Sequence, residues 1–223
     1  EVAICRKNMQ FLLKKAFPEV QIETYEYHDD KEELISVVAD ADAVINTYID
    51  FDREILSQCK KLKVIALNAV GYNMVDVAAA TEYGVMVCPA AEYCTVEVAE
   101  HTMALLLALC RALRKYITSV ENHVWDYTIG GNVERISGKT MTIFGFGKIG
   151  KAVAQRAQAM GIKVQVVSSS LKPEAAEALG VKLVDCDTAL ETSDILSNHQ
   201  ALNGKTAGYF DLEKFARCRR RPI

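Results

Sequence analysis

Short apolar runs and amphipathic segments alternate along this chain from one end to the other. The apolar runs predict strands at 2–5, 20–27, 43–45, 64–67, 85–87, 140–144, 163–167, 181–184 and 195–197. Apolar residues spaced three or four apart predict helices between them, at 9–17, 34–38, 55–59, 149–160, 173–179, 188–191 and 212–215. Strands that alternate with helices indicate a doubly wound parallel sheet with helices on both faces, so the predicted fold class is α/β.

One longer helix is expected between two such α/β regions. Thr95 is expected to cap its first turn, acidic residues follow, and Arg114 and Lys115 near its end match the helix dipole. Between them, residues 103–110 are apolar all round, which indicates a helix that is buried on more than one side. We therefore expect a boundary at Tyr93, with one domain over 1–93 and a second, incomplete at its C-terminal end, over 94–223.

The strand at 140–144 runs into a glycine-rich turn that suits a dinucleotide phosphate. Gly145, Gly147 and Gly150 have the G-x-G-x-x-G spacing. In such a turn the first glycine permits a tight bend, the second lets the backbone reach a pyrophosphate, and the third lets the helix pack closely on the strand. The helix N-terminus adds unpaired N–H groups. The alternative is a glycine-rich turn in another α/β protein, but the flanking strands, the helix and the Gly161 stop favour a dinucleotide site.

Composition excludes several classes of protein. Half of the 223 residues are hydrophobic and a quarter are charged, which is the profile of a globular protein. A formal net charge of −3 offers no basic field to nucleic acid or to an anionic membrane. The basic cluster at 217–221 is interpreted as a solvated end. The apolar stretch at 103–110 is too short to span a bilayer, and no signal peptide is expected.

The thiols and imidazoles show no pattern of a metal or disulfide framework. Seven cysteines are scattered without a C-x-x-C pair, which predicts reduced thiols in a cytoplasmic protein. The four histidines have no ligand spacing with one another or with cysteine, so we expect no metal.

Four segments of the chain match motifs of one enzyme family. Residues 68–76, NAVGYNMVD, are similar to a G-x-G-[YF]-[DN]-x-[IV]-D loop, and residues 98–102, VAEHT, to a V-A-E-H-x segment. The GFGKIG turn at 145–150 is the third match, and DILSNH at 194–199 is a weaker match to D-x-[IV]-x-x-H-x-P. Their order and separations make nearly the whole chain resemble the D-isomer-specific 2-hydroxyacid dehydrogenases.

The resemblance implies a flavodoxin-like substrate domain followed by a Rossmann-type dinucleotide-binding domain. It also implies reversible hydride transfer between NAD or NADP and C2 of a small 2-keto or 2-hydroxy acid. Family members are commonly homodimers through the nucleotide domain, and the apolar helix after Val98 would suit that contact. Two rivals remain: an NAD(H)-binding, corepressor-like or otherwise non-catalytic member of the family, and a different nucleotide-binding protein that shares only the turn. Which acid is the substrate stays open.

On the substrate side, the resemblance places backbone N–H groups of Val70 and Gly71 near the substrate carboxylate, with Asn68 on the rim and Val70 also near the cofactor. A backbone that approaches a ligand closely cannot carry a Cβ, although Gly71 could equally serve a strand-end turn. Asp76 is predicted to cap the following helix rather than to act as an acid. Glu100 and His101 are expected to secure the hinge helix.

On the cofactor side, the resemblance places Lys148 and Ile149 on the phosphate turn. It assigns Gln200, Ala201 and Thr206 to a loop over the adenine and ribose, where Ala201 replaces the family's proline. His199 belongs to that loop and is not interpreted as the catalytic histidine.

The position that selects between NAD and NADP departs from the common pattern. An acidic residue about 20 positions after the glycines usually binds the ribose 2′-hydroxyl and marks an NAD enzyme. Here that position is Ser168, followed by Ser169 and, nearby, Lys172. Hydroxyls and a lysine can accept a 2′-phosphate that a carboxylate would repel. We predict that NADP is accepted; the alternative is that the serines form only a polar turn and NAD still binds.

The family's catalytic arginine, its acidic partner and its histidine are expected beyond Ile223. We therefore expect the chain to be a piece of a longer enzyme and to be inactive alone, and we assign none of Arg219, Arg220 or Arg221 to a catalytic role.

Overall fold

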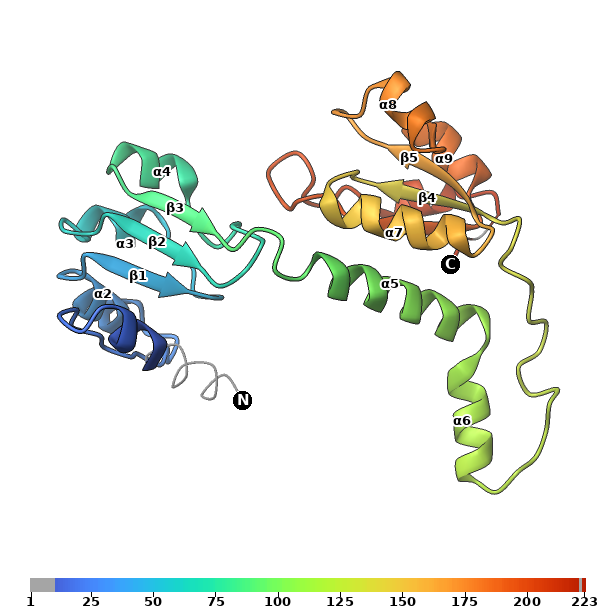
Figure 1. The fold of residues 1–223 in the computed structure, drawn as a ribbon, viewed down its shortest axis with the longest axis horizontal. Coiled ribbons are helices and arrows are strands. Elements are labelled where there is room, and N and C mark those ends of the chain that lie inside the picture. The colour runs from blue at the N-terminus through green and yellow to red at the C-terminus, as the bar shows by residue number, and fades with distance from the viewer. Residues whose placement is uncertain (1–10, 221) are drawn as a thin grey trace. The chain divides into compact units, whose positions relative to one another are not determined.

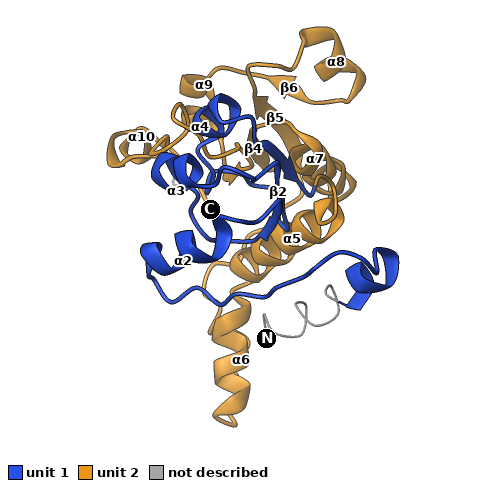
Figure 2. Cartoon of the chain, turned by 90° about the vertical axis from the view of Figure 1, so that its left-hand side faces the viewer, with its two compact units in different colours: residues 1–90 blue, residues 91–223 orange. Residues whose placement is uncertain are grey.

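The computed structural model describes residues 11–220 and 222–223, which form two compact units (Figures 1 and 2). One unit spans residues 1–90 and the other residues 91–223. The strand predicted at 2–5 lies outside the described residues, as do positions 9 and 10 of the helix predicted at 9–17, of which 11–16 are helical. In the described part of the chain, no helix is both long enough and apolar enough to cross a bilayer.

A three-stranded parallel sheet in the order β1-β2-β3 forms the centre of the first unit. Its strands are β1 (Ala43–Asn46), β2 (Val64–Leu67) and β3 (Met86–Pro89). Besides the helical residues 11–16, this unit contains α2 (Lys31–Val38), α3 (Arg53–Gln58) and α4 (Val77–Glu82). Each helix begins after an aspartate whose carboxylate accepts the backbone N–H three residues further on; these are Asp30, Asp52 and Asp76.

The strand predicted at 20–27 is irregular in the structure. Tyr25 and Tyr27 still pack against the core of the first unit, and the Tyr25 hydroxyl donates a hydrogen bond of 3.0 Å to Glu33 on α2. The side chains therefore dock beside α2 without the backbone joining the sheet. The alternating pattern reflected this packing, and the prediction of a strand was wrong.

A four-stranded parallel sheet in the order β6-β5-β4-β7 forms the centre of the second unit. Its strands are β4 (Thr140–Phe144), β5 (Lys163–Val167), β6 (Lys182–Leu183) and β7 (Ile195–Asn198). The helices between and after them are α7 (Lys148–Ala159), α8 (Pro173–Ala178), α9 (Cys186–Thr192) and α10 (Leu212–Ala216). The chain builds outward from β4 through β5 to β6 and then returns to place β7 on the other side of β4. The strand order therefore reverses between β4 and β7, which is where open α/β sheets bind ligands.

The long helix predicted from Thr95 is two helices, α5 (Thr95–Cys110) and α6 (Leu113–Glu121), and Figure 1 shows the chain bending between them. The bend occurs at Ala112, whose φ of 49° is left-handed. Thr95 is the first helical residue rather than the cap, and Cys94 at the cap position makes no side-chain capping bond. Arg114 and Lys115 consequently lie at the start of α6, where they oppose the helix dipole instead of matching it.

Helix α5 buries one face and exposes the other. Ala99, Met103 and Leu106 join the core of the second unit, which includes α7 and the sheet. Leu105 and Leu109 are 53% and 64% exposed. The prediction that this helix is buried on more than one side within its unit was therefore wrong, and an apolar strip remains on its surface.

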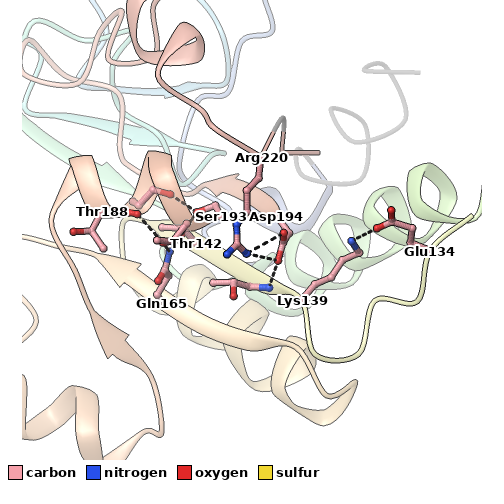
Figure 3. Close-up of polar contacts among 11 residues, drawn as sticks. Glu134, Lys139, Thr142, Gln165, Thr188, Ser193, Asp194 and Arg220 are labelled. Atoms are coloured by element: carbon pink, nitrogen blue, oxygen red, sulfur yellow. Dashed lines mark hydrogen bonds and ion pairs between the residues drawn. The ribbon is translucent and has the colours of Figure 1, made fainter. Parts of the chain in front are cut away.

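A buried polar network joins the middle of the second sheet to α9 (Figure 3). The Gln165 side-chain amide donates hydrogen bonds of 2.7 Å to the Thr142 hydroxyl and 2.8 Å to the Thr192 hydroxyl. Ser193, which is fully buried, bonds to the Thr142 hydroxyl and donates to the Ala189 carbonyl. These contacts fix β4, β5 and the end of α9 to one another.

Candidate functional site

The turn between β4 and α7 needs glycine at two positions for packing reasons. Gly145 has a φ of +85°, and a Cβ there would lie 2.8 Å from the backbone of His199 and Gln200. A Cβ on Gly150 would lie 2.4 Å from the carbonyl oxygen of Gly145. The first glycine thus lets the loop after β7 cross the turn, and the third lets α7 approach β4, as the spacing predicted.

Gly147 is different, because no atom of the described residues occupies the space beside it. A Cβ built on Gly147 would meet no heavy atom within 4 Å, and its φ of −75° is accessible to any residue. Gly147 caps α7 without a side-chain capping bond. The first N–H groups of this helix of 12 residues have no partner within the helix, and they lie next to that open position at the reversal of strand order. Unpaired N–H groups at a helix N-terminus bind phosphate, so these residues fit a dinucleotide pyrophosphate.

Lys148 and Ile149 open α7 and have separate environments. The Lys148 ammonium forms an ion pair with Glu92, and both side chains are 61% exposed. Ile149 is partly buried against the core of the unit. Lys148 is therefore available to an anion at the turn, while Ile149 anchors the helix start.

The loop after β7 lies against the turn. The His199 N–H donates to the Phe144 carbonyl at 2.7 Å, and the His199 Nε2 lies 2.8 Å from the Ser197 hydroxyl. Burial lowers the pKa of His199 below its ordinary value, so the imidazole is neutral near pH 7. These contacts hold His199 in a structural position.

Further along this loop, the Thr206 hydroxyl donates to the Ala201 carbonyl at 2.6 Å and accepts the Asn203 N–H at 2.9 Å. The loop therefore closes on itself even though Ala201 stands where the family has proline. Among the described residues, the Gln200 Oε1 is the single buried side-chain oxygen or nitrogen that has no hydrogen-bond partner. A buried acceptor without a donor is unusual in a folded protein.

The polar turn after β5 carries the serines and the lysine. The Ser168 hydroxyl accepts the N–H groups of Ser170 and Leu171 at 3.3 and 3.2 Å. Ser169 and Lys172 are exposed, and Lys172 precedes α8. Because β5 pairs with β4, this turn lies at the same sheet edge as the glycine turn and the loop after β7.

In the first unit, Asn68, Val70 and Gly71 follow the carboxyl end of β2. The Asn68 N–H donates to the Asn46 carbonyl at 2.8 Å, and Val70 is 38% exposed. Gly71 has no left-handed φ, and a Cβ there would meet only the Asn73 Oδ1, at 3.3 Å. The local backbone therefore does not explain why this position is glycine.

Three other residues have structural roles. The Asp76 carboxylate accepts the Ala79 N–H at 2.9 Å, which confirms the prediction that it caps a helix. Glu100 on α5 lies 3.5 Å from Arg156 on α7 and joins the two helices. His101 on the same helix is exposed.

Two contacts at the turn were not predicted from the sequence. Tyr209 and Phe210 pack on Phe144, with ring centroids 6.0 and 4.8 Å from its ring. Glu92, with a left-handed φ of 73°, reaches Lys148. Both contacts join segments far apart in the chain, and only the aromatic pair before the Asp211 helix cap offered a local signal.

Comparison with known proteins identifies similar chains. Residues 103–223 match the family described as D-isomer specific 2-hydroxyacid dehydrogenase, NAD binding domain. Over 191 residues the chain is 36% identical to the D-3-phosphoglycerate dehydrogenase of Mycobacterium bovis, a match that covers 85% of this chain and 36% of that protein. It is also 36% identical over 180 residues to the glyoxylate reductase of Thermococcus litoralis, covering 78% of this chain and 54% of that protein.

Among solved structures, an acyclic imino acid reductase in complex with NADPH and D-Arg superposes with a TM-score of 0.79 at 25% identity. That match covers 88% of this chain and 62% of the reductase. The chain thus spans about a third to a half of the length of the curated relatives described above, at 36% and 54%.

Proposed function

Because this chain belongs to the D-isomer-specific 2-hydroxyacid dehydrogenase family, we propose that its protein transfers a hydride between a nicotinamide dinucleotide and C2 of a small 2-keto or D-2-hydroxy acid. The observation that carries the proposal is the open space beside Gly147, at the N-terminus of α7 and at the reversal of strand order. This space fits a pyrophosphate, which the backbone N–H groups of α7 would bind.

Each cofactor residue has a proposed task. Gly145 and Gly150 shape the turn, Gly147 leaves room for the pyrophosphate, and Lys148 exchanges its exposed partner Glu92 for phosphate charge. The loop with Gln200, Ala201 and Thr206 covers the adenosine, and the unpaired Gln200 Oε1 is an acceptor for a hydroxyl or amide of the dinucleotide. When bound, the nicotinamide ring supplies or accepts the hydride.

On the substrate side, we assign the carboxylate of the acid to the N–H groups of Val70 and Gly71, with Asn68 at the rim and Val70 also beside the cofactor. The ordinary backbone of Gly71 supports this role, because neither its φ nor its neighbours require glycine. We assign no acid–base role to His199, since the Ser197 hydroxyl and the Phe144 carbonyl already hold it.

We further propose that the protein accepts NADP. Ser168 presents a hydroxyl and orients two backbone N–H groups at the end of β5, and exposed Ser169 and Lys172 lie close in sequence. In this turn, residues 168–172, there is no carboxylate to repel a 2′-phosphate. The expected result is a kcat/KM for NADPH at least equal to that for NADH; a strong NADH preference would contradict the proposal.

Two further properties are proposed. Leu105 and Leu109 of α5 are exposed, and so are Ile117 and Val120 of α6, at 49% and 63%. We assign these apolar side chains of two consecutive helices to the surface that a second copy of the chain covers. We propose a homodimer through this surface, which sedimentation would detect and which L109E should disrupt.

The free thiols of the described residues support a reducing compartment, the cytoplasm.

The test of the main proposal is turnover by the full-length protein. Glyoxylate, hydroxypyruvate and phosphohydroxypyruvate would each be supplied with NADH or NADPH, and loss of the reduced cofactor would be followed by absorbance. Reduction of at least one acid, abolished by a bulky residue at Gly147, is the expected result. Saturable dinucleotide binding without turnover of any acid, together with specific capture of a protein partner, would favour the corepressor-like alternative.

A further inference from the structure

The loops that follow β1 and β2, residues 46–51 and 68–75, leave the first sheet at the same edge, because the two strands are parallel neighbours (Figure 1). At the base of the loops, the Asn68 N–H donates a hydrogen bond of 2.8 Å to the carbonyl of Asn46, the last residue of β1. Further along, Phe51 forms a backbone bridge to the second loop, and its N–H donates a hydrogen bond of 2.7 Å to that loop. The two loops are therefore fixed to each other at both ends.

A buried asparagine shapes the first loop. The side-chain amide of Asn46, which is 2% exposed, donates to the Ile49 carbonyl at 2.7 Å and accepts the Ile49 N–H at 3.0 Å. These bonds close a turn whose two central residues are Thr47 and Tyr48. Tyr48 is 81% exposed. A large aromatic side chain that remains exposed on a fixed turn is available to contact a ligand.

Neither loop carries a positive charge. Residues 46–51 and 68–75 contain no lysine, arginine or histidine, and the exposed Asp50 adds a negative charge. Arg53, the first cation after the first loop in the chain, forms an ion pair of 2.7 Å with Glu82 on α4. A phosphate group that leaves water needs charged hydrogen-bond donors, which arginine and lysine supply. These loops therefore do not suit a phosphorylated acid.

We propose that Tyr48 selects the substrate, and that the protein acts on 2-keto acids whose side chain is uncharged rather than phosphorylated. The inference rests on the proposed function, which assigns the substrate carboxylate to the N–H groups of Val70 and Gly71 in the second loop. With the carboxylate bound there, the Tyr48 ring on the adjoining loop contacts the side chain of the acid and removes apolar area of both from water. Asp50 on the same loop repels a phosphate group.

Initial rates of the full-length protein with NADH or NADPH test the substrate class. Hydroxypyruvate and phosphohydroxypyruvate differ only in the phosphate group, so their comparison isolates its effect. We expect kcat/KM for hydroxypyruvate to exceed that for phosphohydroxypyruvate at least tenfold. Equal values, or a preference for the phosphorylated acid, would overturn the proposal and leave the proposed function intact. Turnover of no acid at all would contradict both.

Substitutions of Tyr48 test its role as the residue that contacts the side chain of the acid. Glyoxylate, which has no side chain, is compared with whichever of hydroxypyruvate, pyruvate and phenylpyruvate gives the highest kcat/KM. Y48A should raise KM for that acid by about 2- to 10-fold and leave KM for glyoxylate unchanged, while Y48F, which retains the ring, should behave like the unaltered protein. Y48R should raise kcat/KM for phosphohydroxypyruvate, because a guanidinium binds phosphate.

A second tyrosine provides the matched control. Tyr83 ends α4 and precedes β3, so it lies at the opposite edge of the sheet. Y83A should leave the ratio of the two KM values unchanged, and Y48A should have the melting temperature of the unaltered protein because its side chain is exposed. KM values that Y48A leaves unchanged or raises equally for both acids would show that Tyr48 does not select the substrate. Turnover of glyoxylate alone would exclude the contact with a side chain.

Discussion

Two alanine substitutions in the glycine turn, G147A and G150A, should affect folding and cofactor binding separately. A Cβ at Gly147 would meet no heavy atom of the described residues within 4 Å, and the backbone angles there suit alanine. G147A should therefore fold as well as the unaltered chain, or slightly better, because alanine restricts the unfolded state. The same Cβ would occupy the space that we assign to the pyrophosphate. Loss of one or two charged hydrogen bonds, worth about 1.5–3 kcal/mol, predicts dinucleotide binding weaker by about 10- to 150-fold.

G150A is the matched variant with the opposite expectation for folding. Its Cβ would lie 2.4 Å from the Gly145 carbonyl oxygen and 3.3 Å from the Ile143 side chain. Overpacking costs about 1–3 kcal/mol, and the better helix propensity of alanine returns about 0.5–1 kcal/mol. A net loss of about 1–2 kcal/mol lowers the melting temperature by about 2–8 °C for a chain of this size.

Thermal unfolding and calorimetric titration with NADH and NADPH would measure both effects on the full chain. We expect the two variants to rank in opposite order in the two assays. G147A should have the higher melting temperature of the two and the weaker dinucleotide binding. Retention of full affinity by G147A would refute the assignment of that space to the cofactor. A melting temperature of G150A equal to that of the unaltered chain would refute the packing argument.

Other substitutions test the cofactor turn, a helix cap and a buried imidazole. S168D should lower the affinity for NADPH at least tenfold, because a carboxylate repels the 2′-phosphate, while NADH binding should persist; equal losses for both cofactors would contradict this. D76A removes the cap of α4 and should cost about 1 kcal/mol in urea unfolding, whereas D40A, which removes an exposed ion pair, should cost almost nothing. Because the folded pKa of His199 is depressed, its neutral form stabilises the fold above about pH 6.5, and that contribution is lost as the pH falls through the folded pKa. H199Q should flatten the stability curve below about pH 6.5, and an unchanged slope would exclude His199 as its cause.

The second unit was the most predictable part of the molecule. β4, β5 and β7 are short, mainly apolar runs, so local sequence indicates that they are strands, although it does not determine their order in the sheet. The roles of Gly145 and Gly150 also followed from spacing, because a close backbone approach leaves no alternative residue.

The errors occurred where tertiary contacts decide the structure. The left-handed Ala112 divides α5 from α6, although nothing in its neighbours resembles a helix stop. The apolar face of α5 was interpreted as internal, while Leu105 and Leu109 are exposed. Residues 20–27 alternate like a strand but use that pattern to dock two tyrosines. Sequence periodicity shows which apolar side chains share one face of a helix or strand, but it does not show what covers that face.

The substrate side could not be assigned from hydrophobic periodicity. Asn68, Val70 and Gly71 were assigned by resemblance, and their place after β2 remains a proposal for function.

The buried network around Gln165 has a consequence for how the sheet assembles. Side chains on a strand alternate between its two faces, so a slip of β5 by one residue would turn the Gln165 amide away from Thr142 and Thr192. A buried amide left without partners costs about 1–3 kcal/mol for each lost group. Misaligned pairings of β4 with β5 are therefore penalised in a way that purely aliphatic strands would not penalise them. A Q165L chain should bury this position at little cost in final stability, yet it should populate misregistered intermediates more often during refolding.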